Sequence, residues 1–483
     1  MSNSVEHQTQ CAVPEGPQLK KRNINGVVFV ATMGALAFGF DTGVIAGAIP
    51  FLQLPFDQGG LSLGPNEVGL VTSSLLLGAA FGGIGSGHLS DQKGRKRTLL
   101  VLAILFIVGA LGTSVAPNIA VMVIFRILLG LAVGGASATV PVFIGELAPT
   151  HLRGKLVARN ELTIVTGQLL AYITNASLAT LLPDNHHVWR FMLLICTVPA
   201  LLLFFGTFYL TESPRWLIAH GRLEEARQAL WQLRDEENVD GELQEIKDHV
   251  EQTAKIEATS LREEMKTPWI RRIVLIGVGL AFLSQMTGVN SVMYYAPSIL
   301  IDTGLGTNAS LVATIGNGIV AVTSVAFGSM VLLPKFRRRP MLLTGQIGVT
   351  CALALMGAAF VFLPETNFRS YLVLAFMMLF LFFMQGFVAV IFWLMLSEIF
   401  PLRIRGKAMG VAVFANWTAN FIVAMVFPPL QASLGGGLFF IFALINLGTI
   451  FFYLKFIPET RGRSLEELET RFEELDGKNL ALA

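Results

Sequence analysis

The chain contains little cysteine and little charge. Three of its 483 residues are Cys, and Asp, Glu, Lys and Arg together make up 14%. Cys11 lies in a polar segment, whereas Cys196 and Cys351 lie in separate apolar runs, a spacing that fits neither a disulfide framework nor a zinc site. Soluble domains contain about 25% charged residues. The deficit therefore argues against a water-soluble protein.

An excess of basic charge and a nucleotide-binding motif are also lacking. The 35 Lys and Arg nearly balance the 33 Asp and Glu, so a nucleic-acid partner is not expected. No G-x-x-x-x-G-K-[ST] segment occurs, which excludes ATP-driven transport through such a loop. His88, His151, His186, His187 and His220 fall in loops or at span ends. We therefore expect no metal, no cofactor and no membrane-embedded enzyme site.

The chain is instead rich in long hydrophobic runs. It is 53% hydrophobic, with a mean hydropathy of +0.63. A membrane-spanning helix needs about 20 mainly apolar residues, and two groups of six such runs occur, at 25–52, 66–88, 98–116, 118–141, 157–182 and 189–210, and at 270–300, 309–333, 340–363, 370–397, 406–430 and 436–457. The pattern predicts an all-α polytopic membrane protein with twelve transmembrane helices in two halves.

The Lys and Arg residues of the short loops predict the orientation. They cluster in alternate loops, near 93–97, 153–155, 335–339 and 403–407, whereas the opposite loops hold only Arg190 and Arg369. Cytoplasmic loops carry the basic excess, so both termini and the charged segment 212–268 are expected in the cytoplasm. The first 22 residues do not fit a cleaved signal peptide.

These boundaries define five parts of the chain. The expected parts are a cytoplasmic tail at 1–24, six-helix halves at 25–211 and 269–457, a connector at 212–268 and a cytoplasmic tail at 458–483. The connector has helical patterning. It is interpreted as a solvated amphipathic segment, which we favour, or as a bundle that latches both halves.

The two halves repeat each other. Glu146 and Arg153 recur as Glu398 and Arg405, both shifted by 252 positions. The basic loop at 93–97 recurs at 335–339, and the motif at 212–215 is echoed at 458–461. Internal repeats of this kind are typical of transporters whose site lies between the halves.

Several longer segments resemble the sugar porters of the major facilitator superfamily over nearly the whole chain. They include FGFDTGVIAGA at 38–48, GHLSDQKGRKR at 87–97, TGQLL at 166–170, ESPRWL at 212–217, TGVNSVMYYAP at 287–297, LSEIFPLRIRGKA at 396–408 and PETRGRSLEEL at 458–468. The strongest likeness is to bacterial proton-coupled hexose, pentose and inositol symporters. One departure is the second basic loop, where Pro334 and Arg337 replace the usual Asp and Gly.

Two charged residues lie within predicted spans. Asp41 is in the first span and Arg126 in the fourth. A charge at the bilayer centre costs at least about 2.5–3.5 kcal/mol, so such residues pair or face a polar cavity. The pair can be a static ion pair, or its carboxylate can change proton affinity as it is alternately paired and desolvated. The resemblance implies proton coupling at Asp41. On Arg126's helix face, Gly130 and Gly134 are expected to serve close packing.

A sugar site requires amides, which both donate and accept hydrogen bonds, and an aromatic ring. Candidates at membrane depth are Gln168, Gln285, Asn290, Trp393, Asn416 and Trp417. Interhelical hydrogen bonding is the alternative role for each amide. The resemblance assigns Gln168, Gln285, Asn290, Trp393 and Asn416 to sugar contacts, with Asn416 and Ser284 in place of more usual Gln residues.

Helix geometry opposes a shared site for two of these amides. Gln285 and Asn290 are five residues apart, about 140° out of phase on a straight helix. A local break at Gly288 would bring them together, and broken helices are tolerated where they line a cavity.

The remaining candidates are gate residues. Asp91 and Arg95 could form a solvated pair worth little. The resemblance implies that they, with Glu146, Arg153, Glu398 and Arg405, form salt bridges that close the cytoplasmic side. Tyr294 and Tyr295 are expected to gate the extracellular side.

These observations predict H+ symport of a monosaccharide or cyclic polyol across the bacterial inner membrane. The expected partners are the sugar, H+ and the lipid bilayer, and the chain is expected to act as a monomer. Asp41 disfavours the alternative of a facilitated uniporter. A sugar sensor would normally have a longer cytoplasmic tail than 458–483.

Overall fold

The computed structural model describes residues 21–149, 152–234, 239–255, 261–401, 404–461 and 465–474, and these parts contain helices and no strand. Among the described residues, twelve helical segments are long and apolar enough to cross a membrane. The fold predicted from the hydrophobic runs is therefore confirmed.

The spans of the N-terminal half run through α1 to α7. They are α1 (Ile24–Leu52), α2 (Pro65–Lys93), α3 (Arg95–Ser114), α4 (Ile119–Leu147), α5 (Arg153–Leu181), and α6 (Val188–Ile195) continued by α7 (Thr197–Thr207). A short η1 (Phe56–Gln58) follows α1.

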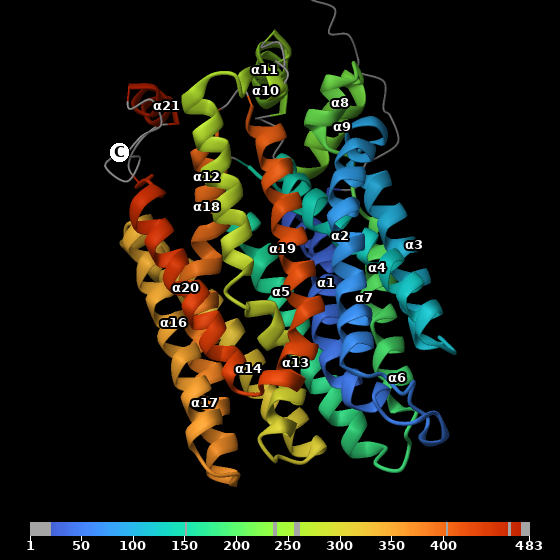
Figure 1. Ribbon diagram of the computed structural model, residues 1–483. Coiled ribbons are helices and arrows are strands. Elements are labelled where there is room, and N and C mark those ends of the chain that lie inside the picture. Colours follow the sequence, from blue (N-terminus) through green and yellow to red (C-terminus); the bar gives the residue numbers. More distant parts are fainter. Residues whose placement is uncertain are drawn as a thin grey trace, which may run out of the picture.

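Three spans of the C-terminal half are interrupted. The half comprises α12 (Pro268–Gln285) with α13 (Val289–Asp302), α14 (Thr307–Phe327) with the π-helix η3 (Gly328–Leu332) and α15 (Leu333–Lys335), α16 (Arg338–Phe362), α17 (Asn367–Phe383) with the π-helix η4 (Met384–Ala389) and α18 (Val390–Ile399), α19 (Arg405–Leu434) and α20 (Gly437–Phe456). Figure 1 shows the blue-to-green α1–α7 beside the yellow-to-red α12–α20.

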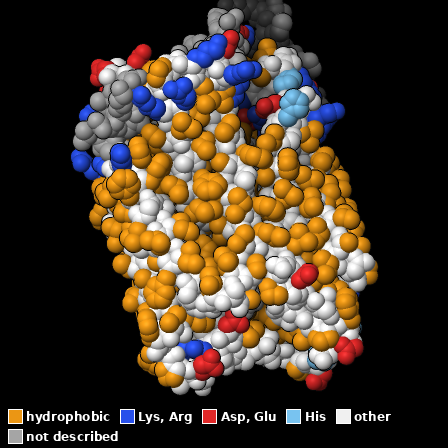
Figure 2. Space-filling view, in the orientation of Figure 1, with side chains coloured by type: hydrophobic (Ala, Val, Ile, Leu, Met, Phe, Trp, Pro, Cys, Tyr) orange, Lys and Arg blue, Asp and Glu red, His pale blue; other side chains and the backbone are white. Residues whose placement is uncertain are grey.

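The outer surface is suited to lipid. Exposed side chains of the spans are largely Phe, Leu, Ile and Val. Figure 2 shows them covering the middle of the molecule, with Lys and Arg gathered at the end that carries the connector helices. That distribution follows from the absence of water in the bilayer core, where charged side chains are costly.

Glycine lets α2 and α4 approach closely. A Cβ atom on Gly130 would lie 2.0 Å from the Leu75 carbonyl oxygen, and one on Gly134 would lie 2.0 Å from that of Ala79. Any side chain at either position would force the backbones apart. The packing role predicted for both glycines is confirmed.

The connector contains α8 (Pro214–Ala219), α9 (Leu223–Leu233), α10 (Val239–Lys255) and α11 (Leu261–Glu264). α8, α9 and α10 share a small core that includes Trp216, Leu217 and Leu230. The Trp216 indole donates to the Asp91 carbonyl at 2.7 Å, and Arg234 donates to the Leu147 carbonyl at 3.0 Å. These bonds attach the connector to α2 and α4. A last helix, α21 (Leu465–Glu474), follows α20 at the same end (Figure 1).

Candidate functional site

The two intramembrane charges form a buried ion pair. The Arg126 guanidinium donates to both Asp41 oxygens, at 3.0 and 3.3 Å, and to the Val71 carbonyl at 3.3 Å. Each side chain is 1% exposed. Burial without water strengthens the attraction between the charges and makes removal of one partner costly. The pair ties α1 to α4, and the Val71 bond adds α2.

A hydroxyl next to this pair reaches the first sugar-site candidate. Thr42 follows Asp41 in α1, and its hydroxyl accepts a hydrogen bond from the Gln168 amide of α5 at 3.0 Å. The residue that directly follows the carboxylate in the chain is therefore the hydrogen-bond partner of Gln168.

The three amides of the C-terminal half converge. The Asn290 amide donates to the Gln285 oxygen at 2.7 Å, and the Gln285 amide donates to the Asn416 oxygen at 2.9 Å. Ser284 also donates to that oxygen, at 3.4 Å. Gly288, with φ +83°, separates α12 from α13, as its position between Gln285 and Asn290 predicted. Side chains that a straight helix would point apart thus meet.

A methionine of the C-terminal half contacts one amide from each half. The Met293 sulfur of α13 accepts from the Gln168 amide at 3.4 Å and from the Gln385 amide at 3.7 Å. The Tyr172 hydroxyl donates to the Met293 carbonyl at 3.0 Å. Met293 is therefore a contact between the halves at the level of the candidate site.

Sequence reasoning missed Met293, Gln385 and a third residue, Asn317. Asn317 of α14 is 1% exposed, and neither polar atom of its amide has a hydrogen-bond partner within the described chain. Its neighbour Gly318 packs against Leu169 and Tyr172 of α5. An intramembrane amide is the one signal that could have identified Gln385 and Asn317.

The two tryptophans differ in their surroundings. Trp417 is 5% exposed, and its ring centroid lies 5.9 Å from that of Phe38, across the boundary between the halves. Its indole nitrogen is buried without a partner among the described residues. Trp393 is half-buried and lies edge-on to Phe392. Within the part of the chain that the structure describes, no hydrogen bond joins Trp393 to the amides.

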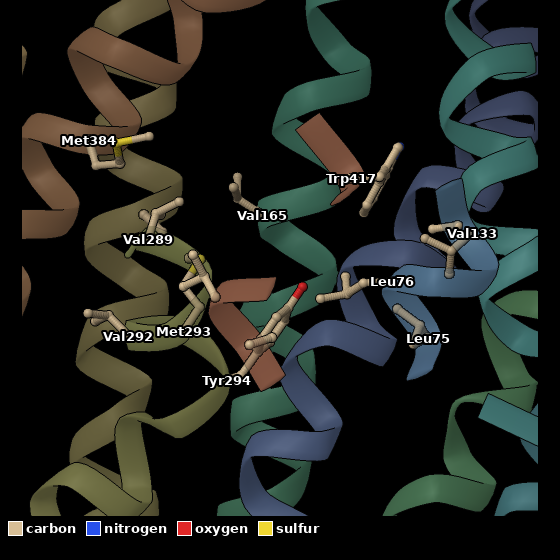
Figure 3. Close-up of a cluster of buried hydrophobic side chains, with 14 of the residues drawn as sticks. Leu75, Leu76, Val133, Val165, Val289, Val292, Met293, Tyr294, Met384 and Trp417 are labelled. Carbon is tan, nitrogen blue, oxygen red and sulfur yellow. The ribbon is translucent and has the colours of Figure 1, made fainter. Parts of the chain in front are cut away.

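The two tyrosines predicted to form a gate, Tyr294 and Tyr295, lie in α13 within an apolar layer. Tyr295 stacks on Phe427 with centroids 5.1 Å apart and donates to the Ala424 carbonyl at 2.8 Å. Figure 3 shows Tyr294 between Met293 and Val292 on one side and Leu75 and Leu76 on the other, with its hydroxyl directed toward Leu76. This layer spans both halves.

The basic loop at 93–97 forms a cluster at the connector end. Arg95 binds Glu146 with two hydrogen bonds of 2.9 Å and lies 3.2 Å from Asp91. Glu212 accepts from the Arg95 backbone N–H at 2.8 Å and from that of Lys96 at 3.2 Å, so it caps α3. Burial raises the pKa of Glu212, and the backbone hydrogen bonds oppose that shift.

The corresponding basic loop of the C-terminal half, at 335–339, has a longer ion pair. Glu459 caps α16, accepting from the Arg338 backbone N–H at 3.0 Å, which mirrors Glu212. Arg338, the counterpart of Arg95, lies 3.9 Å from Glu398. Its Nε and one Glu398 oxygen have no hydrogen-bond partner within the described chain. The missing Asp at Pro334 accounts for part of this difference.

Two further gate candidates have other surroundings. Arg405 donates to the Phe400 carbonyl at 3.3 Å. The side chain of Arg153, at the start of α5, lies outside the described residues.

Comparison with known proteins gives concordant matches. The family model described as "Sugar (and other) transporter" matches residues 27–472. The major myo-inositol transporter IolT of Bacillus subtilis is 47% identical over 93% of this chain and 94% of its own length. An inward-open structure of the xylose transporter XylE from E. coli aligns with TM-score 0.79 at 31% identity, covering 93% of this chain and 99% of XylE.

A second XylE structure is that of the proton:xylose symporter bound to 6-bromo-6-deoxy-D-glucose. It aligns with TM-score 0.75 at 32% identity, over 93% of this chain and 99% of that one.

Proposed function

Because the chain belongs to the sugar transporter family of the major facilitator superfamily, we propose that it carries a monosaccharide or a cyclic polyol together with H+. The observation that carries this proposal is the short path from the buried Asp41–Arg126 pair through Thr42 to Gln168. A titratable carboxylate thus adjoins the hydrogen-bond partner of Gln168, a candidate sugar-binding residue.

The amide groups supply the sugar contacts. A thioether is a weak hydrogen-bond acceptor, so a sugar hydroxyl would replace the Met293 sulfur as the acceptor for Gln168 and Gln385. Gln285, Asn290 and Asn416 offer further donors and acceptors from the other half. Trp393 and Trp417 are proposed to cover the ring. The relatives' names, myo-inositol and xylose transporters, support a polyol class that includes hexoses, pentoses and inositol.

Protonation of Asp41 is the proposed coupling step. The neutral acid keeps hydrogen-bonding capacity but loses the ionic attraction to Arg126. The bond between α1 and α4 then weakens, and the halves can change their arrangement with sugar bound. With Asp41 ionised, the buried pair resists that change. A ligand or proton shifts such an equilibrium only by favouring one state.

The proposed conformation is inward-facing, with the connector and both termini in the cytoplasm. Contacts between the halves, including Ser73 with Met425 at 3.5 Å and Gln168 with Met293, lie at mid-membrane or toward the end opposite the connector. Tyr294 and Tyr295 belong to the closed outer layer. The ion pairs of Arg95 with Glu146 and Arg338 with Glu398 are proposed to join a cytoplasmic gate with Arg153 and Arg405. The chain is proposed to act as a monomer, without enzymatic activity, in the bacterial plasma membrane.

Sugar-induced alkalinisation of the medium tests the coupling. Cells expressing the wild type should alkalinise weakly buffered medium when a transported sugar is added. Asp41→Asn should abolish that signal and uphill accumulation, yet retain sugar exchange between pre-loaded vesicles, because it mimics the protonated acid. Asp302→Asn is the matched control. Asp302 is also a hydrogen-bonded acid, but it lies at the end of α13, where it accepts from Gln431. It should keep the signal.

The alternatives give other results. A facilitated uniporter would exchange sugar without alkalinisation in the wild type, and a sensor would bind sugar without uptake. If Asp41→Asn fails to fold, the wild-type signal alone decides between symport and uniport.

A further inference from the structure

A cavity at the connector end lies outside the sugar path. It has a volume of about 250 Å³ and lies between the loop that joins α2 to α3, the end of α7 and the start of the connector. Its lining includes three cations where α2 ends and α3 begins, Lys93, Lys96 and Arg97, together with Arg222 of the connector. One acid, Glu212, also lines it.

The positive charge of this cavity is only partly neutralised. Glu212 is already hydrogen-bonded to the backbone of Arg95, Lys96 and Ser213, and Arg222 pairs with Glu225. Within the described chain, the side chains of Lys93, Lys96 and Arg97 make no hydrogen bond or ion pair. Clustered cations with so little counter-charge favour an anion.

The side of the cavity that faces away from the connector is apolar and continues into the lipid-facing surface. Leu100 of α3 and Phe208, which directly follows α7, line it. From Leu100 the stripe of α3 proceeds through Ile104 and Val108, and from Phe208 that of α7 proceeds through Phe205, all with exposed side chains beyond the cavity. α3 and α7 pack side by side, and both stripes begin at the cavity; together they are called the apolar strip.

We propose that this cavity binds the phosphate headgroup of an anionic phospholipid from the leaflet on the connector side. A basic cavity that opens onto an apolar strip fits a ligand with a negative head and an acyl tail, and a soluble anion would leave the strip unused. Trp216 suits the boundary between the basic and the apolar side of the cavity, because indole rings favour the headgroup level of a bilayer. It lines the same cavity and is held by its bond to Asp91.

Lipid titration of the purified full-length protein tests this site. Palmitoyl-oleoyl-phosphatidylglycerol is added to protein in dodecyl maltoside, and thermal unfolding is followed by tryptophan fluorescence, with native mass spectrometry to count bound lipids. Phosphatidylglycerol should raise the unfolding temperature saturably, and palmitoyl-oleoyl-phosphatidylcholine should not. Lys93→Gln/Arg97→Gln should raise the half-saturating lipid concentration by roughly tenfold or more, because each nearby cation attracts anionic lipid.

The repeat supplies a matched control. Lys335→Gln/Arg337→Gln removes two exposed cations from the counterpart loop and should leave the titration unchanged. Equal weakening in both double variants would overturn the proposal, since the effect would then be one of general surface charge. Sodium phosphate or glycerol 3-phosphate alone giving the same shift as phosphatidylglycerol would also overturn it, in favour of a soluble anion.

Discussion

The amide of Gln168 donates both to the Thr42 hydroxyl and to the Met293 sulfur, and Asn290 donates to Gln285. Gln168→Ala and Asn290→Ala should each weaken sugar binding by about 1–3 kcal/mol, roughly 5- to 150-fold in Kd, because a sugar hydroxyl loses its partner. Equilibrium binding of labelled sugar to purified protein measures this.

Gln346→Ala is the control for these two variants. Gln346 is also a fully buried amide, but its amide nitrogen bonds Asn446, between α16 and α20, and not a candidate sugar-site residue. It should leave sugar affinity unchanged even if stability falls. Unaltered affinity in both Gln168→Ala and Asn290→Ala, with folded protein, would remove these residues from the site.

Gly94 and Arg337 occupy equivalent places in the two basic loops, with different backbones. Gly94 has φ +93°, and its Cβ would lie 2.3 Å from a Glu212 oxygen, whereas Arg337 has φ −70°. Gly94→Ala should therefore lower the free energy of unfolding by about 1–3 kcal/mol, and Arg337→Ala should leave it nearly unchanged. Thermal unfolding in detergent compares them. A loss of equal size in both variants would contradict this account.

Which side chains meet was only partly predictable from the sequence. The Asp41–Arg126 pair was expected because few charges lie within the spans, and an isolated one is costly. The contact of Gln168 with Thr42 and the bridging role of Met293 were not, since they depend on how α1, α5 and α13 pack. Many hydroxyls and thioethers lie at similar depth, and sequence pattern does not choose among them.

At the scale of the element, the break between α12 and α13 brings Gln285 to Asn290. Gly288 has φ +83°, and Gly304 at the end of α13 has φ +100° with open space around it. Both Gly288→Ala and Gly304→Ala should lose stability, because L-residues adopt this conformation at a cost. Only Gly288→Ala should also weaken sugar binding, by shifting one amide relative to the other. Equal sugar affinity in the two variants would disconnect the break from the site.

The spans themselves were predictable because a run of about 20 apolar residues is the length that a helix needs to cross a bilayer. The break at Gly288 was predictable because Gln285 and Asn290 would point in different directions on a straight helix. The π-helices η3 and η4 and the division of the sixth span at Cys196 were not predicted. A π-helix adds one residue to a turn without a distinctive composition, so hydrophobic pattern alone does not reveal it.

At the scale of the whole molecule, transport requires the contacts between the halves to separate. In a background with the three native cysteines replaced by Ser, Ser73→Cys/Met425→Cys should cross-link through a short bifunctional methanethiosulfonate, because these side chains touch between α2 and α19. Uptake should stop and return after reduction. Radiolabelled sugar uptake into cells measures it.

A cross-link within one half is the control. The hydroxyl of Thr303, which directly follows α13, lies 2.8 Å from that of Ser370 in α17. Thr303→Cys/Ser370→Cys should therefore cross-link and leave uptake largely intact. Full uptake through the Ser73→Cys/Met425→Cys cross-link would mean that this contact does not open during transport.

The orientation of the molecule predicts which ends can be labelled. In the cysteine-free background, His186→Cys should react with an impermeant maleimide on intact cells. Asp240→Cys, in the connector helix α10, should react only after the membrane is opened, because the basic loops are expected in the cytoplasm. If only Asp240→Cys were labelled from outside, the orientation in the membrane would be the opposite of the predicted one.

The caps on α3 and α16 have a consequence for how the protein is made. Glu212 follows Arg95 by 117 residues, and Glu459 follows Arg338 by 121. At ribosomal rates of about 5–20 residues per second, Glu212 is synthesised roughly 6–23 s after the backbone N–H groups of α3 that it caps. Each half thus completes its third span only when its sixth has been synthesised. Each half can therefore complete the cap of its third span from its own residues, independently of the other half.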